Sequence, residues 1–577
     1  MKRLYILNVI FAAGIIWMIC NIFPATMKML EGDSLFLTTK SFFISKLSQG
    51  AGLNGWITDF LLQFFYNPLY ASLINAILLC AISISAAYVI KKIKGNSRFV
   101  DIAIISSCML LLLFPYQINL QIEGIVFYLT LLIYICLPKY WQRTIWCIMF
   151  VFIGYLMLSL PIQIMCLVVI AAYELWHMRN FKYLLTHLCC IAASITIVYI
   201  YSNYVEFIPY EQRYFYTKSI IGTERECLYT IIFLLPFAAI TLNRIKKQKI
   251  SIISSIVMLG FIIITIGYNA YNSRFLYNEK IYNYVLLADN KEWSELLSQL
   301  QAEDHGNKDE IVLKYSLLAE SALGTLPEHL FQYPINDAEE FLFIHDRNPI
   351  GYLFNAMFYE NAKVYDEAYH QFFEYNTLQN NGNCFTSLRH MIEYCIKEAD
   401  FPVAEKYLAV LEKSTCHDKY VQQHREHIKQ LKEKGYKPEV PLRSDNFVGG
   451  YPFNSEMVRQ LQLYPQSKTY LDYLLCGLLL QKKLYEFSVI IAGFPLYKGK
   501  ELPRAYAEAA ALMEANRMSM KQLYPYPDDY DKQFRDFYKA YTAHAPEVET
   551  TFADSYWYYY FYTELPEEVQ KSSANFH

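Results

Sequence analysis

Arg244-Ile245-Lys246-Lys247-Gln248-Lys249 separates two apolar runs, residues 228–242 and 250–270. Lysine and arginine collect in the cytoplasmic loops of membrane proteins, so this stretch predicts that the chain is cytoplasmic here. The next apolar run then carries the chain out of the cytoplasm after Ala270. More than half of the protein follows that point and is expected outside the cytoplasmic membrane.

The other basic clusters near the N-terminus obey the same bias. They are Lys2 and Arg3; Lys91, Lys92, Lys94 and Arg98; Lys139 and Arg143; and Arg179 and Lys182. A path of nine spans places all of them on the cytoplasmic face. The predicted spans are 4–23, 71–90, 101–116, 122–138, 144–159, 161–176, 183–204, 228–242 and 250–270. This path predicts a bacterial inner (cytoplasmic) membrane protein with a cytoplasmic N-terminus and a periplasmic C-terminal domain, residues 272–577.

Two local features decide the span count. The turn Leu158 to Gln163, which contains Pro161, predicts a tight helical hairpin, and the alternative is one long kinked span. The basic stretch at 244–249 favours the hairpin, because one span fewer would move that stretch outside. The run Leu4–Phe23 has no small-residue cleavage site after it, so it is expected to be a retained span and not a removed signal peptide.

Composition agrees with a chain that is half membrane and half soluble. Hydrophobic residues make up 54% and charged residues 18%, and the mean hydropathy of +0.14 is too low for a chain that lies entirely in the membrane. A net charge of −3 provides no basic surface for nucleic acid, so we expect no nucleic-acid partner. Of the 13 cysteines, only Cys384, Cys395, Cys416 and Cys476 lie in the soluble half. We expect these four to be free thiols, although an outward domain would permit disulfides.

The soluble half carries the spacing of a tetratricopeptide repeat. Tyr352, Ala356 and Tyr359, followed by Ala368 and Phe372, match the pattern in which small residues let two helices approach closely. Similar helix pairs are expected at 278–301, 386–413 and 468–494, with a further small-residue helix at 505–515. The predicted fold class is therefore all-α: a transmembrane bundle at 1–271 and a helical repeat domain at 272–577. Such arrays are usually docking surfaces, and the alternative is a packed cap on the membrane part.

The aromatic run Tyr556-Trp557-Tyr558-Tyr559-Tyr560-Phe561-Tyr562 is expected to close the fold. On a helix its rings point in all directions, which suits burial between the last repeats or contact with the bilayer interface. A surface on which sugars stack is the third alternative.

Candidate catalytic residues lie in the long first outward loop. Asp33, with Glu31 as the alternative, follows the first span, and Leu35 to Leu47 is expected to form an interfacial amphipathic helix. A carboxylate there can deprotonate an attacking hydroxyl. Glu123, Arg213 and Lys218 are expected on the same outward face as substrate-binding residues, with the cations holding a phosphate. The alternative for the cations is a solvated loop.

We expect no metal and no cofactor. Cys416, His417, His424 and His427 have a helix-compatible ligand spacing, but a solvated helix face rich in Lys and Glu is the preferred interpretation. Glu174, beside Trp176 and His177, is expected to be interfacial only.

Two resemblances follow from these residues. Asp33-Ser34-Leu35-Phe36-Leu37 and Leu61-Leu62-Gln63-Phe64-Phe65-Tyr66 resemble an uncharacterised bacterial family of multi-spanning membrane proteins with a helical-repeat C-terminus. The acidic residue after the first span, followed by an interfacial helix, is similar to the layout of the C-type glycosyltransferases. That similarity implies a polyprenyl-phosphate sugar donor, Asp33 as the base, and a protein or glycan acceptor on the repeats. The competing hypothesis is a non-catalytic, membrane-anchored scaffold for envelope protein assembly.

Overall fold

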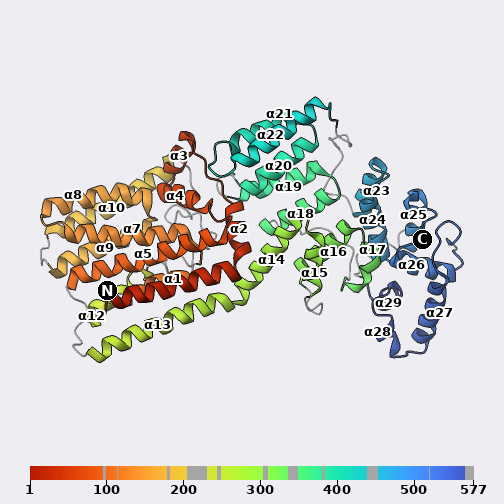
Figure 1. The fold of residues 1–577 in the computed structure, drawn as a ribbon, viewed down its shortest axis with the longest axis horizontal. Helices are drawn as coiled ribbons and strands as arrows, with labels where there is room; N and C mark the ends of the chain where they lie inside the picture. The colour runs from red at the N-terminus through yellow and green to blue at the C-terminus, as the bar shows by residue number, and fades with distance from the viewer. Residues whose placement is uncertain are drawn as a thin grey trace. The chain divides into compact units, whose positions relative to one another are not determined.

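The computed structural model describes residues 1–94, 99–113, 115–177, 182–204, 231–242, 248–302, 309–335, 348–379, 384–437, 453–518 and 520–565. Every regular element in these ranges is a helix, which confirms the all-helical prediction (Figure 1). The chain divides into two compact units. The first holds residues 1–280, 379–386 and 406–427, and the second holds residues 281–378, 387–405 and 428–577.

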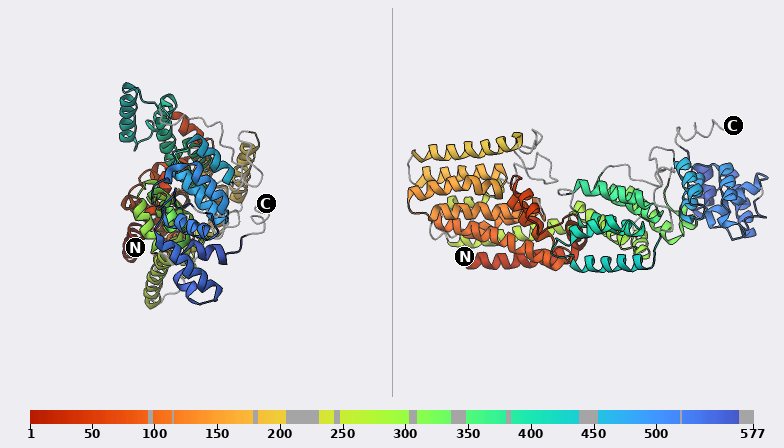
Figure 2. Two further views of the ribbon diagram at one scale, coloured as in Figure 1. Left: turned by 90° about the vertical axis from the view of Figure 1, so that its right-hand side faces the viewer. Right: turned by 90° about the horizontal axis from the view of Figure 1, so that it is seen from above.

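The first unit is a bundle whose long helices lie side by side (Figures 1 and 2). Its helices are α1 (Lys2–Ile22), α2 (Pro24–Gly32), α3 (Lys40–Leu47), α4 (Gly52–Leu62), α5 (Pro68–Lys94), η1 (Val100–Ile104), α6 (Ile105–Leu113), α7 (Ile118–Cys136), α8 (Tyr140–Met157), α9 (Leu160–His177), α10 (Lys182–Tyr204), η4 (Leu235–Phe237), α12 (Ala238–Leu242) and α13 (Gln248–Tyr271). One continuous apolar core joins these helices except α3, and it extends from Leu4 on α1 to Ala270 on α13.

Five of these helices are long and apolar enough to cross a membrane: α1, α5, α7, α10 and α13. The segments Val100–Leu113 and Leu160–Trp176 are apolar but shorter. The described part of the expected span at 228–242 is not one helix, because the short helices η4 and α12 follow a turn there. The chain therefore has several membrane-spanning candidates, and the count of nine spans stays a prediction.

The hairpin at Pro161 is confirmed. Helix α8 ends at Met157, Leu158 has extended backbone angles, and α9 begins at Leu160. The two helices are in contact at Gly154, where a Cβ atom would lie 2.5 Å from Gln163 Nε2. That same amide nitrogen donates to the carbonyl of Val151 at 2.9 Å, so a larger side chain at position 154 would have to displace it.

The first outward loop differs from its prediction. Only Lys40–Leu47 is helical, because Thr39 caps that helix through a bond from Phe42 N to its Oγ1 at 3.2 Å. The preceding residues 34–39 form no helix, and Leu35 and Phe36 are buried in the protein. Phe36 packs edge-on against Phe42, Trp56 and Phe60. The expected amphipathic helix over Leu35–Leu47 is therefore shorter than predicted, at 8 residues, and begins five residues later.

Two segments from the soluble half of the sequence belong to the first unit. We call residues 379–386 and 406–427 the clamp segments. Cys384 Sγ donates to the Gly32 carbonyl at 3.0 Å, and Thr38 N donates to the Lys413 carbonyl at 2.8 Å. Thr415 Oγ1 donates to the Gln63 side chain. The two units are therefore not separated by one boundary after residue 271, because the chain passes between them several times.

The second unit consists mainly of helix pairs. The helices that lie in it wholly or in part are α14 (Ser273–Asp289), α15 (Trp293–Gln301), α16 (Glu310–Leu323), α17 (Leu326–His329), η5 (Leu330–Gln332), α18 (Pro349–Asn361), α19 (Tyr365–Leu378), α20 (Phe385–Lys397), α21 (Phe401–Leu411), α22 (Asp418–Glu433), α23 (Phe453–Leu463), α24 (Lys468–Leu480), α25 (Leu484–Gly493), η8 (Pro495–Tyr497), α26 (Arg504–Ala515), α27 (Asp528–Thr542), α28 (Glu547–Thr551) and α29 (Tyr556–Tyr562).

The same turn closes many of these helices. A residue with positive φ follows the helix, and the next N–H donates to the carbonyl five residues earlier. The bonds are Glu292 to Leu287, Thr325 to Glu320, Val364 to Tyr359, Tyr436 to Leu431, Lys483 to Leu478, Met518 to Met513 and Ala545 to Ala540. This is the Schellman geometry, which normally uses glycine at the positive-φ position. Here the residue with positive φ is a glycine in two turns, Gly324 and Gly435. In the other five turns it carries a side chain: Lys291, Lys363, Lys482, Arg517 and His544.

The pair α18–α19 occupies the predicted hairpin at 350–376. Ala356, Ala368 and Phe372 are fully buried, and Tyr359 is buried beside them. Helix α29 carries the aromatic run, with Tyr556, Trp557 and Tyr559 buried. The Trp557 indole donates to the Glu508 carbonyl at 2.8 Å, so this run does pack into the end of the fold.

Candidate functional site

Asp33 is placed by helix α2. It is the C-terminal cap of that helix, and its N–H donates to the Met29 carbonyl at 2.9 Å. The other end of α2 is held by Glu279, whose carboxylate accepts from Ala25 N and Thr26 N, each at 2.7 Å. A carboxylate at a helix N-terminus satisfies free amides and interacts favourably with the helix dipole. Asp33 and Glu31 are both half-buried at the opposite end.

Glu123 lies inside the helical bundle. It is fully buried, and its two oxygens accept from Ser159 N at 2.9 Å and Ser159 Oγ at 3.1 Å. These bonds fix the turn that begins α9, which is a structural role. Arg213 and Lys218, the cations expected beside Glu123, lie outside the described residues. The predicted substrate-binding set therefore stays a prediction.

Glu174, predicted to be interfacial only, is buried in the protein and belongs to an ion pair. It is 2% exposed and accepts from Arg143 Nη1 and Tyr134 OH, both at 2.8 Å. The ends of α7, α8 and α9 meet here, and the ion pair allows both charges to be buried. Nothing in the residues around Glu174 indicates that Arg143, thirty-one residues away, is its partner.

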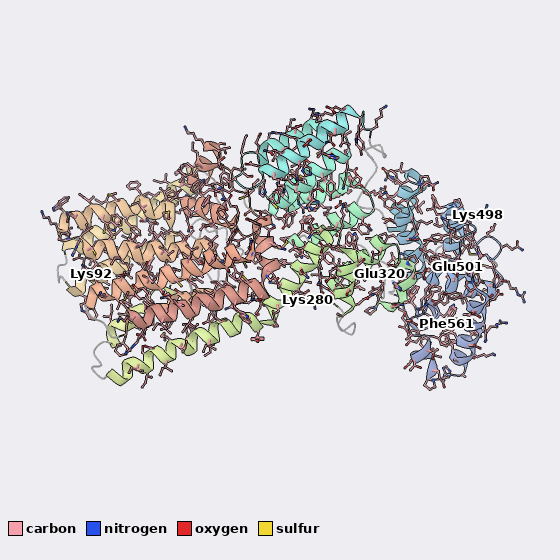
Figure 3. The ribbon with its side chains drawn as sticks, in the orientation of Figure 1. Lys92, Lys280, Glu320, Lys498, Glu501 and Phe561 are labelled. Carbon is pink, nitrogen blue, oxygen red and sulfur yellow. The ribbon has the colours of Figure 1, made fainter. Side chains whose placement is uncertain are left out.

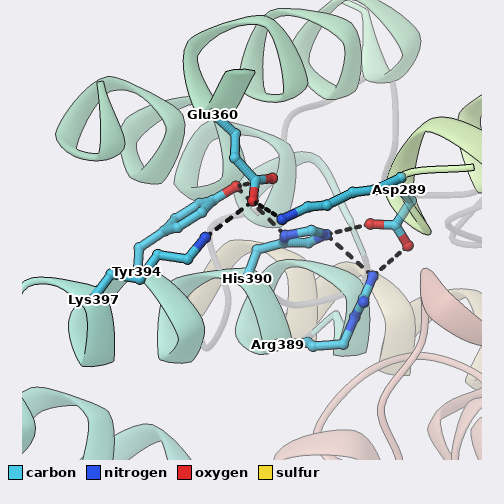
Figure 4. A network of polar contacts seen from close by, with 7 residues as sticks. Asp289, Glu360, Arg389, His390, Tyr394 and Lys397 are labelled. Atoms are coloured by element: carbon cyan, nitrogen blue, oxygen red, sulfur yellow. Dashed lines mark hydrogen bonds and ion pairs between the residues drawn. The ribbon is translucent and has the colours of Figure 1, made fainter. Parts of the chain in front are cut away.

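The densest polar network lies in the second unit and joins three helices (Figure 4). Asp289 ends α14, Glu360 lies on α18, and Arg389, His390, Tyr394 and Lys397 lie on α20. Positions 390, 394 and 397 have the spacing of one helix face. His390 Nε2 is 2.6 Å from Asp289 Oδ1, and Arg389 pairs with the other oxygen of the same carboxylate.

Glu360 forms the second half of the network. It accepts from Tyr394 OH at 2.9 Å and pairs with Lys397 at 3.1 Å and Lys291 at 2.9 Å. Burial acts to raise the pKa of Glu360, but Lys397, His390 and Lys291 outweigh it and lower the pKa to about 2. Asp289 is likewise buried, and His390 and Arg389 hold its pKa well below the usual range.

The network holds helices together and presents little reactive surface. His390 is 3% exposed, and its ring stacks on Phe372 at 4.0 Å between centroids. The site residues predicted from the sequence include none of these groups. The signal that could have found them is the row His390, Tyr394 and Lys397, which places three side chains able to form hydrogen bonds on one face of a helix.

No group of three or more His, Cys, Asp or Glu side chains in the described ranges could hold a metal ion. His417 stacks on Phe385 at 3.8 Å, and burial lowers its pKa to about 4. His424 stacks on Tyr420. The cysteines of the soluble half, Cys384, Cys395, Cys416 and Cys476, are free thiols, as expected.

These features define a helical membrane protein with an additional unit of helix pairs. The chain belongs to DUF6057, a family of unknown function, whose match covers residues 2–563. No curated protein and no solved structure matches the chain.

Proposed function

We propose that this protein is a membrane-anchored scaffold, in which the bundle carries an extracytoplasmic set of helix pairs that docks envelope proteins. The observation that supports the proposal most is the binding of the clamp segments to the first outward loop. Gly32, Thr38 and Gln63 accept or donate hydrogen bonds to residues more than 350 positions later in the chain. Because the chain passes between the two units at each end of these segments, the helix pairs are joined to the bundle at several points along the chain.

Charge pairing also favours the scaffold. Glu123, Glu174, Asp289 and Glu360 are buried carboxylates whose partners are other side chains or backbone of the same unit. A catalytic carboxylate must instead meet its substrate within hydrogen-bond reach. These four groups therefore act in the scaffold by fixing helix ends and helix pairs.

A C-type glycosyl transfer is the second candidate, and the position of Asp33 favours it. Asp33 is half-buried and directly follows Gly32, where the clamp segment at 384 attaches. In this alternative the soluble half presents an acceptor hydroxyl to Asp33, which takes its proton as the donor sugar is transferred from a polyprenyl phosphate.

One complementation experiment separates the two. The double variant Asp33→Asn with Glu31→Gln should restore a deletion strain fully if the protein is a scaffold. If the protein is a transferase, loss of the general base lowers the rate typically 10²–10⁴-fold, and the envelope glycans of the strain should disappear. Protease protection in spheroplasts checks that the variant is inserted.

A second pair of variants tests the scaffold directly. Thr38→Pro removes the N–H that donates to the Lys413 carbonyl, whereas Thr38→Val keeps that N–H and loses only the hydroxyl. We expect Thr38→Pro to speed hydrogen exchange in residues 406–427 and to abolish complementation, and Thr38→Val to have the smaller effect on both. Full complementation by a Thr38→Pro protein with a released clamp segment would contradict the scaffold proposal.

A further inference from the structure

Helix α25 is apolar on both of its faces. Leu484, Phe487 and Ile491 are buried, whereas Tyr485 is 72% exposed and Val489 is 50% exposed. Ala492 continues the exposed row at helical spacing. Among the described helices of the soluble half, only α25 is as apolar as the short apolar helices of the bundle. Its 10 residues cannot cross a bilayer, and an apolar helix of this length fits a core or an interface.

The exposed face is wider than one helix. The turn that holds Leu523 packs beside α25, because Tyr524 OH donates to the Ile491 carbonyl at 2.7 Å. Gly499 N also donates to the Leu523 carbonyl at 3.2 Å. Leu523 itself is 53% exposed. We call Tyr485, Val489, Ala492 and Leu523 the α25 surface.

Lysines border this surface. Lys498 and Lys500 follow η8 and are exposed, and Figure 3 labels Lys498 and Glu501 in the second unit. Lys483, before the helix, lies 3.9 Å from Glu486, and Lys482 donates to the Thr563 carbonyl. Lys498 and Lys500 are therefore the cations that remain exposed beside the apolar side chains, with Glu501 as the nearest acidic residue in sequence.

We propose that the α25 surface lies in the headgroup region of a phospholipid bilayer. Tyr485 suits the boundary between headgroups and acyl chains, where tyrosine collects, and Val489, Ala492 and Leu523 reach the first methylenes. Lys498 and Lys500 keep their stems along the apolar region and direct their ammonium groups to lipid phosphates. A phospholipid surface is the favoured partner because the spans of the same chain keep a bilayer at high effective concentration. This contact is separate from protein docking and does not depend on the proposed function.

Hydrogen exchange of the full-length protein tests the contact. The chain is placed in nanodiscs of phosphatidylcholine with phosphatidylglycerol and in uncharged maltoside micelles. We expect amides of 484–500 to exchange on the order of tenfold more slowly in the discs. The buried helix α24 is the internal reference and should exchange equally in both. If the surface binds a second bilayer and not its own, protection appears only when vesicles of the same lipids are added.

Matched variants identify the groups responsible. Tyr485→Glu with Val489→Glu should abolish the lipid-dependent protection, whereas Tyr538→Glu, at another exposed aromatic residue, should leave it intact. Lys498→Gln with Lys500→Gln should weaken binding to anionic lipid on the order of 30-fold. Lys532→Gln with Lys539→Gln on α27 is its control.

Three outcomes would overturn the proposal. The first is equal exchange of 484–500 in micelles, in discs and with added vesicles. The second is protection that rises with the number of chains per disc, which would indicate contact with a second copy. The third is protection that survives Tyr485→Glu with Val489→Glu, which would place the lipid contact elsewhere.

Discussion

Replacing Asp289 by asparagine tests whether the polar network holds α14 to α20. The carboxylate lies 2.6 Å from His390 Nε2 and pairs with Arg389. Its side chain is 11% exposed and that of Arg389 is 23% exposed. Asparagine keeps the size and removes the charge, so it removes a carboxylate that pairs with the Arg389 guanidinium in a mostly buried place.

The expected cost follows from that burial. Breaking a fully buried ion pair costs about 3–5 kcal/mol, and the partial exposure of Arg389 to water reduces this to about 2–3 kcal/mol. Amides that exchange by separation of α14 from α20 should therefore exchange about 30- to 150-fold faster. Hydrogen exchange measured by mass spectrometry on the full-length protein reports both helices.

The effect should depend on pH in a fixed direction. His390 and Arg389 outweigh burial and depress the pKa of Asp289, so its stabilisation is complete above the unfolded carboxyl pKa of about 3.9. That stabilisation is lost as the pH falls further, toward the depressed folded pKa. The wild-type protein should therefore lose stability below about pH 4, whereas Asp289→Asn has no carboxylate at this position to protonate. The difference in stability between the two proteins should become smaller as the pH falls.

The control is Glu412→Gln, which removes an exposed pair with Arg425 at 2.7 Å. Exposed pairs contribute at most about 1 kcal/mol, so exchange should change little. If α14 and α20 exchange at the same rates in Asp289→Asn as in the wild-type protein, the argument that this network holds the two helices together is refuted.

The remaining predictions concern the hairpins and the topology. Ala368→Leu should overpack the α18–α19 contact and lower the free energy of unfolding by about 1–3 kcal/mol in urea titrations, whereas Ala543→Leu, at an exposed position, should not. Lys363→Gly should raise the free energy of unfolding by about 0.5–1 kcal/mol, because the φ of 63° at Lys363 is strained for a residue that carries a Cβ atom. Lys363→Ala keeps a Cβ atom and should not raise the free energy of unfolding. A C-terminal alkaline phosphatase fusion should be active and a cytoplasmic fluorescent fusion dark, and the reverse result would disprove the nine-span path.

The helices could be predicted from local periodicity, whereas contacts between residues far apart in the sequence could not be predicted. The hairpin at Pro161 and the pair at 350–376 follow from turn residues and small-residue spacing within about forty residues. The partners Arg143 for Glu174, Glu279 for α2 and Asp289 for His390 are ordinary charged residues, and nothing in their neighbourhood marks them. The helix predicted at Leu35–Leu47 failed at its start because Leu35 and Phe36 are buried by tertiary contacts, which override local helical preference.

The ends of the helices in the second unit were hard to predict from the sequence for a physical reason. Turns that use a main-chain bond and tolerate lysine, arginine or histidine at positive φ do not require the glycine that usually marks a helix end. The position of the candidate catalytic loop was predictable from the apolar run of α1, but the short helix α2 that Asp33 caps was not, because it is held by Glu279, more than 250 residues later in the chain.

The clamp segments impose an order of events during synthesis. Gly32, Thr38 and Gln63 emerge early, but their partners Cys384, Lys413 and Thr415 follow 352 to 375 residues later. At about 5–20 residues per second the first loop waits roughly 20–70 s for them. The bundle therefore stays incomplete until residues 384–415 have been synthesised, so a chain that stops before residue 384 lacks all of these hydrogen bonds.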